Sequence, residues 1–151
     1  MVIAIEPDPK NFDILRKNIL LNNLRNVRTF NLAAWSKKDK LKLFIGDFSA
    51  WHSAKTNFGQ GYFVVQALTL DEILNQVNVK KITFVKIDVE GAELEVLKGF
   101  SDSLSRLQPS IIVEIWEKDK PRLEQIRAFA IERKLDFKRI GPDYYLISPI
   151  E

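Results

Sequence analysis

A short apolar run that ends abruptly in acidic residues constrains the fold more than any other feature of the chain. Residues 82–87 are rich in β-branched and aromatic side chains, and Asp88, Glu90 and Glu93 follow directly. Apolar residues at helical spacing then continue to Gly99. A buried strand followed at once by a helix is typical of an open α/β sheet, in which ligands bind at the carboxyl ends of the strands. The acidic residues therefore mark a candidate site.

The first residues repeat this arrangement. Residues 2–5 indicate a buried strand, and Glu6 follows it. Asp8 is placed to cap a helix whose first turn contains Pro9, a position that proline favours. In nucleotide-binding folds an acid at the end of a strand binds ribose hydroxyls, and a glycine-rich turn lies about 20 residues before it. Because the acid here is residue 6, the chain corresponds to such a fold from its second strand onwards.

Helix and strand signals alternate along the rest of the chain, with no linker, repeat or low-complexity tract. Thr69 and Glu72 have the spacing of a capping box at the start of a helix over 70–76, and Pro121 is expected to open the last helix. We therefore expect one α/β domain over residues 1–151, with a mainly parallel sheet and a C-terminal antiparallel hairpin. The strands expected in one sheet are 2–5, 27–34, 40–45, 82–87, 110–115 and 137–148.

Residues 46–62 form the longest stretch without helical or strand periodicity. Long loops inside compact domains are usually functional or disordered. The aromatic residues of this loop are Phe48, Trp51, Phe58 and Tyr62. They either anchor the loop or stack on a planar substrate. His52 is the only histidine of the sequence. Because histidine titrates near neutral pH, His52 is a candidate base over an acceptor, and the alternative is an exposed side chain.

The composition argues against several classes of protein. The chain has no cysteine, so it forms no disulfide or thiolate metal site, and a reducing cytoplasm is expected. Its net charge is +3, from 23 basic and 20 acidic residues. A nucleic-acid-binding surface needs more concentrated basic charge, so no nucleic-acid partner is expected. No apolar run approaches about 18 residues, so no membrane span is expected either.

Five motifs in the right order resemble those of the FkbM-type methyltransferases, S-adenosylmethionine-dependent enzymes with a Rossmann-like fold. The motifs are EPDPKNFDILRKNILLN (6–22), NLAAWS (31–36), TLDEIL (69–74), KIDVEGAE (86–93) and PSIIVEIWE (109–117). The first strand of that family, its glycine-rich turn and the next helix have no counterpart here. The resemblance therefore implies an N-terminally truncated form of the fold.

The resemblance also implies a function, which is methyl transfer from S-adenosylmethionine to an oxygen of a small molecule or sugar. Carried over to this sequence, Glu6 would bind the ribose hydroxyls of the cofactor. Ala33 and Ala34 would lie beside its adenine. Asp88 would lie below the methionine part and the acceptor. Much of the catalysis in such a displacement is the alignment of the two reactants.

Two further residues are candidates at the acceptor. Glu114 lies near the end of a buried strand, where a charge needs a partner or a function. A carboxylate or histidine can remove the hydroxyl proton, so Asp88, Glu114 and His52 are the expected catalytic residues. For Asp88 the alternative is to cap the following helix. Asp88, Glu90 and Glu114 also suit a cation if they converge, although no metal site is expected.

A second class of function stays open, namely a methyltransferase-fold chain that does not catalyse and acts as a binding or dimerisation module. In the family, the strand without a counterpart here lies between the strands at 2–5 and 82–87. Without it, we expect these two strands to pair directly or to leave edges that recruit a second copy of the chain. A homodimer through this edge is therefore expected.

Overall fold

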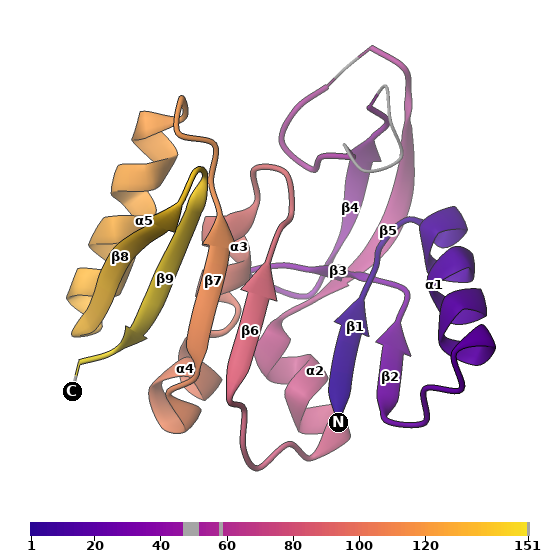
Figure 1. Cartoon of the computed structure of the whole chain (residues 1–151). Helices are drawn as coiled ribbons and strands as arrows, with labels where there is room; N and C mark the ends of the chain where they lie inside the picture. The colour runs from indigo at the N-terminus through magenta and orange to yellow at the C-terminus, as the bar shows by residue number, and fades with distance from the viewer. Residues whose placement is uncertain (47–51, 58, 151) are drawn as a thin grey trace.

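The computed structural model describes residues 1–46, 52–57 and 59–150, and in this part of the chain helices and strands alternate (Figure 1). The strands are β1 (Val2–Ile5), β2 (Val27–Phe30), β3 (Ala33–Ala34), β4 (Asp39–Phe44), β5 (Tyr62–Leu68), β6 (Phe84–Ile87), β7 (Ser110–Glu114), β8 (Leu135–Gly141) and β9 (Tyr144–Pro149). The helices are α1 (Pro9–Leu21), α2 (Leu70–Val77), α3 (Glu93–Lys98), α4 (Ser101–Leu107) and α5 (Lys120–Glu132). The predicted α/β class and the C-terminal antiparallel hairpin, β8 with β9, are confirmed.

The strands form three hydrogen-bonded groups, so the prediction of one sheet was wrong. β1 pairs in parallel with β2, β5 lies between β3 and β4, and the last group has the order β6-β7-β9-β8. The predicted strand over 27–34 is broken into β2 and β3. Between them, the Asn31 side chain donates hydrogen bonds to the carbonyl oxygens of Glu6 and Pro7, at 2.9 and 3.2 Å. These bonds turn the chain towards β5.

A cavity separates β1 from β6. It has a volume of about 900 Å³ and is lined by residues of both strands. Among the described strands, β1 is paired only with β2 and β6 only with β7. Val2 and Phe84, on the two strands, remain 51% and 52% exposed. Of the two outcomes expected for these strands, the structure therefore has unpaired edges rather than direct pairing.

Polar caps define where three of the helices begin. Asp8 accepts hydrogen bonds from two backbone N–H groups in the first turn of α1, at 2.6 and 3.1 Å, so the helix begins at Pro9. Thr69 and Glu72 form the predicted capping box of α2. Asp119 caps α5 by accepting a single hydrogen bond, from the Arg122 N–H at 3.2 Å. The helix starts predicted at Asp8 and Thr69 are confirmed.

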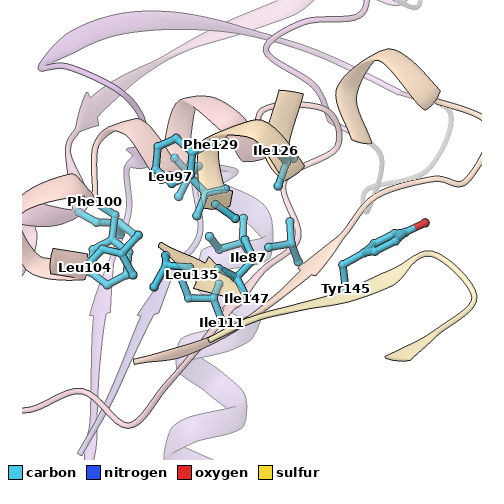
Figure 2. Packing of buried hydrophobic residues seen from close by; sticks show 14 of the residues in the cluster. Ile87, Leu97, Phe100, Leu104, Ile111, Ile126, Phe129, Leu135, Tyr145 and Ile147 are labelled. Atoms are coloured by element: carbon cyan, nitrogen blue, oxygen red, sulfur yellow. The ribbon is translucent and has the colours of Figure 1, made fainter. Parts of the chain in front are cut away.

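The main hydrophobic core lies between the β6–β9 group and helices α2 to α5, with apolar residues of β1 and β2 packed against its edge. Figure 2 shows its centre. Fully buried side chains there include Leu97, Phe100, Ile111, Ile126 and Ile147. A smaller cluster joins β3, β4 and β5. The packing of β1 residues against the main core attaches β1 to the rest of the molecule, although no backbone pairing joins β1 to β6.

Gly99 lies where α3 ends, against the backbone that leaves β3. A Cβ atom at this position would be only 2.0 Å from the carbonyl oxygen of Trp35. The Gly99 carbonyl also accepts a hydrogen bond from the Asp71 N–H, at 3.0 Å, at the start of α2. The segment after β3 and the start of α2 therefore both pack directly against the backbone of Gly99. Only glycine allows so close an approach.

We expect Gly99→Ala to destabilise the chain by about 3 kcal/mol, the upper part of the range for overpacking, because the added methyl group meets backbone. For a chain of this size that lowers Tm by roughly 6–12 °C. Gly141→Ala is the matched control, since its Cβ would lie 3.8 Å from Tyr144, an ordinary contact. Thermal unfolding followed by circular dichroism measures both variants. Equal Tm values for the two would contradict the close approach at Gly99.

Candidate functional site

The cavity between β1 and β6 collects most of the residues that the sequence singles out. Its lining includes Glu6, Ala33, Ala34, His52 and Asp88. Glu6 and Asp88 follow the carboxyl ends of β1 and β6, where ligands bind in open α/β folds. A volume of about 900 Å³ lies within the usual range of small-molecule and cofactor sites, roughly 300–1,000 Å³. The arrangement can therefore enclose a ligand of cofactor size.

Glu6 is held in place by the turn that begins α1. Its Oε1 atom accepts a hydrogen bond from the Asp8 N–H at 2.8 Å. Burial raises the pKa of the Glu6 carboxyl, and the Asp8 N–H offsets part of this effect by stabilising the charged form. A partly desolvated carboxylate with a fixed orientation suits the recognition of neighbouring hydroxyl groups.

His52 lies at this cavity, but both of its ring nitrogens are engaged. Its Nε2 atom lies 2.7 Å from Oδ2 of Asp8, and its Nδ1 atom accepts a hydrogen bond from the Gly46 N–H at 3.3 Å. Nε2 therefore carries the hydrogen and donates it to Asp8. His52 fixes the loop to the start of α1, and its role as a base stays a prediction. Of the four aromatic residues of the loop, Phe48, Trp51 and Phe58 lie outside the described residues, and Tyr62 packs edge-on against Phe44 in β4.

Lys86 joins the two predicted acceptor carboxylates. Its Nζ atom donates a hydrogen bond to Oδ2 of Asp88 at 2.7 Å and lies 3.8 Å from Oε2 of Glu114. The bond to Asp88 raises the pKa of Lys86, and a bond to Glu114 raises the pKa of Tyr144. Asp88 does not cap α3, because that helix begins at Glu93 and has no side-chain cap. The capping alternative for Asp88 was therefore wrong.

A second cavity, of about 370 Å³, lies at the carboxyl ends of β6 and β7 beside the start of α5. Its lining includes Glu114 and Trp116 from β7 and the segment after it, and Arg122 from α5. Asp88 and Glu90 line both cavities. Ligands in the two cavities would therefore meet at these two carboxylates.

The sequence places Glu93 among the acidic residues after β6 but does not predict its burial. Glu93 is only 2% exposed, its Oε1 atom accepts a hydrogen bond from the Gly91 N–H at 2.8 Å, and Nη1 of Arg122 lies 3.5 Å from Oε2. Burial raises the pKa of its carboxyl. Ser53 was missed as well. It is fully buried, and its Oγ atom donates a hydrogen bond to the Glu90 carbonyl at 2.8 Å. The contacts Glu93–Arg122 and Ser53–Glu90 each join segments that are far apart in the sequence, so no local sequence pattern predicts them.

The described residues contain neither a candidate metal site nor a membrane-spanning helix. No group of three or more His, Asp or Glu side chains there has an arrangement that holds a metal ion. Asp88, Glu90 and Glu114 thus line one cavity without converging on a single point. No helix in the same part of the chain is long and apolar enough to cross a bilayer.

Comparison with known proteins relates the chain to methyltransferases. A family model described as the methyltransferase FkbM domain matches residues 1–138. The chain is 28% identical to methyltransferase sdnD of Sordaria araneosa, covering 91% of this chain and 65% of that protein. It is 32% identical to the hexuronic acid methyltransferase AglP of Haloferax volcanii, covering 76% of this chain and 46% of that protein. It therefore spans less than two thirds of the length of each of these relatives.

A solved structure supports the fold. The crystal structure of methyltransferase FkbM from Methylobacillus flagellatus KT matches with a TM-score of 0.68 and 18% sequence identity. The match covers 97% of this chain and 36% of that protein. At this low identity the likeness shows that the two chains share a fold.

The burial of Glu90 leads to a prediction about stability and pH. Burial raises the pKa of its carboxyl, and the charges of Asp88, Glu114 and Glu93 raise it further. Above the ordinary value of 4.5 the unfolded chain releases this proton more readily than the folded chain, so ionisation penalises the folded state. The penalty is complete once the pH exceeds the raised pKa, and it is absent well below pH 4.5.

We therefore expect Glu90→Gln to raise Tm at pH 7.5 and to leave it nearly unchanged at pH 3.5. Thermal unfolding at the two pH values measures the difference. Glu132→Gln is the control, because its side chain is 75% exposed and lies at the C-terminal end of α5, whereas the cluster lies beside the start of that helix. A gain of equal size at both pH values would show that the effect does not come from ionisation of Glu90.

Proposed function

Because the chain belongs to the family of FkbM methyltransferases, we propose that it binds S-adenosylmethionine in the β1–β6 cavity and methylates a hydroxyl oxygen of a small molecule or sugar. One observation carries this proposal. Glu6, Ala33, Ala34 and Asp88, which come from three separate sequence motifs, line a single cavity at the carboxyl ends of β1 and β6.

The residues present fit this cofactor. The Glu6 carboxylate, oriented by the Asp8 N–H, offers acceptor oxygens to the two ribose hydroxyls. The short side chains of Ala33 and Ala34 leave room for the flat adenine ring. When bound, S-adenosylmethionine supplies a methyl group on a positively charged sulfur. The acceptor oxygen would bond to the methyl carbon, and the S–C electron pair would return to sulfur. The carboxylates of Asp88 and Glu90 favour a cation in this part of the cavity.

The acceptor hydroxyl has to lose its proton as the oxygen is methylated. Asp88 lies where the two cavities meet, so it is placed to receive that proton, and Glu114 lines the second cavity. Glu90 is a further candidate. It lines both cavities, and its raised pKa brings its proton affinity closer to that needed by a general base at neutral pH. Lys86 keeps the Asp88 carboxylate in position through their hydrogen bond.

A sugar is one acceptor that the comparisons make reasonable, since a relative is described as a hexuronic acid methyltransferase. The second candidate function is a non-catalytic binding or dimerisation module. It is favoured by the unpaired edges of β1 and β6, whose backbone donors and acceptors can pair with a strand of a second copy. Binding of the cofactor product separates the two candidates.

We expect S-adenosylhomocysteine to bind the 151-residue chain, measured by isothermal titration calorimetry. Glu6→Gln should weaken this binding by about 10- to 100-fold, since a hydrogen bond to a charged group contributes roughly 1.5–3 kcal/mol. Glu132→Gln, at an exposed position, should bind as the unmodified chain does. Lack of binding at millimolar ligand would favour the non-catalytic module. Equal affinity of Glu6→Gln and the unmodified chain would remove Glu6 from the site.

A further inference from the structure

The second cavity has an aromatic wall beside its carboxylates. Trp116 follows β7, lines this cavity and is 40% exposed. The Lys118 ammonium lies 4.5 Å from the centre of its ring, which fixes the indole without burying it. The exposed part of the ring therefore offers an aromatic surface to a ligand in the cavity. The face of a sugar ring, which presents C–H groups, matches the electron-rich face of an indole.

The polar lining consists mainly of hydrogen-bond acceptors. Glu90 and Glu114 line the cavity, and Glu114 is itself only about a quarter exposed. Oε2 of Glu93 is too buried to be reached from the cavity, and it has no hydrogen-bond donor among the described residues, although Arg122 lies 3.5 Å away. Glu90 and Glu114 are therefore the lining glutamates that can accept hydrogen bonds from a ligand. A ligand with several hydroxyl groups supplies such donors.

The charge of the lining restricts that ligand further. Five carboxylates line the cavity and two cationic side chains do, and a third cation, Lys86, bonds Asp88 and lies 3.8 Å from Glu114 without lining the cavity. One of the two lining cations, Arg122, is already paired with Asp119 at 2.7 Å and lies beside Glu93. The other, Lys118, lies over the Trp116 ring. The cavity therefore carries an excess of negative charge that repels an anionic group.

From this geometry we propose that the second cavity is the acceptor site and that it binds an uncharged polyhydroxylated ring, such as a hexose unit of a glycoside. Trp116 stacks on the C–H face of the ring, and Glu90 and Glu114 accept hydrogen bonds from its hydroxyl groups. The cavity discriminates against sugars that carry a carboxylate or phosphate. The inference rests on the proposed function, because Asp88 and Glu90 place this cavity next to the cofactor cavity.

A matched pair of probes tests the charge selectivity. Methyl β-D-glucopyranoside and methyl β-D-glucopyranosiduronate differ only in the group at C6, which is uncharged in the first and a carboxylate in the second. Saturation-transfer NMR titrations with the 151-residue chain, without any cofactor, give the two affinities. We expect the uncharged glycoside to bind at least about tenfold more tightly than the uronate. Equal or tighter binding of the uronate would overturn the proposal.

Substitutions test the roles of Trp116, Glu90 and Glu114 in sugar binding. Trp116→Ala should weaken binding of the uncharged glycoside by about tenfold or more, whereas Trp116→Phe, which keeps an aromatic face, should stay close to the unmodified chain. The double variant Glu90→Gln/Glu114→Gln should reduce the preference for the uncharged sugar over the uronate. A mere loss of structure would not change that ratio, and melting curves identify variants that do not fold. An unchanged ratio, or an unaffected Trp116→Ala, would refute the assignment.

Titration of S-adenosylhomocysteine into the same preparations distinguishes failure of the acceptor-site assignment from failure of the methyltransferase proposal. Cofactor binding without binding of either sugar would overturn the acceptor assignment and leave the methyltransferase proposal in place. Binding of the uncharged glycoside without cofactor binding would support the sugar site and count against methyl transfer. Methyl β-D-glucosaminide, a cationic probe, should bind no more weakly than the uncharged glycoside, because the lining carries an excess of negative charge. Clearly weaker binding of this probe would refute the charge argument.

Discussion

The buried carboxylate of Glu93 is the constraint on which the acidic edge of the molecule depends. A carboxylate with 2% exposure is tolerated only if neighbouring groups compensate its desolvation. The Gly91 N–H and the Arg122 guanidinium provide that compensation, the first within the turn after β6 and the second from α5. The turn is closed tightly enough that a Cβ atom on Gly91 would lie 3.0 Å from Arg122. One side chain thus determines how the turn that carries Asp88 and Glu90 is placed against α5.

Arg122 extends this constraint to the second cavity. Besides its contact with Glu93, it bonds Asp119 at 2.7 Å, and Asp119 is the residue that caps α5. Charged groups therefore link the start of α5 to the turn after β6, in addition to the apolar packing of Leu123 against the core. The consequence is a concave surface between the two elements whose lining is rich in charged side chains, in contrast to the apolar core beneath it. A site for a hydroxyl-rich ligand follows naturally from that arrangement.

The parts of the fold that the sequence predicted are those governed by local rules. The caps at Asp8 and Thr69 depend on residues within one helical turn, and the strand ends at Glu6 and Asp88 depend on the apolar runs before them. The features that were missed depend on distant partners. Asn31 breaks a predicted strand because its amide bonds carbonyl oxygens 24 and 25 positions away. No periodicity records such a contact. The acidic cluster was found in the sequence, but its division between two cavities depends on the placement of α5.

The loop that contains His52 explains how the first cavity keeps its shape without a backbone ladder between β1 and β6. His52 contacts Asp8, just beyond β1, whereas the next residue, Ser53, bonds the carbonyl of Glu90, just beyond β6. Two consecutive residues therefore connect the two sides of the cavity at its carboxyl end. Both bonds are largely shielded from water, because Ser53 is fully buried and the side chains of His52 and Asp8 are only 12% and 9% exposed. Since Glu6 lies next to the first contact and Asp88 near the second, the spacing of these two carboxylates depends on this loop as much as on the strands that carry them.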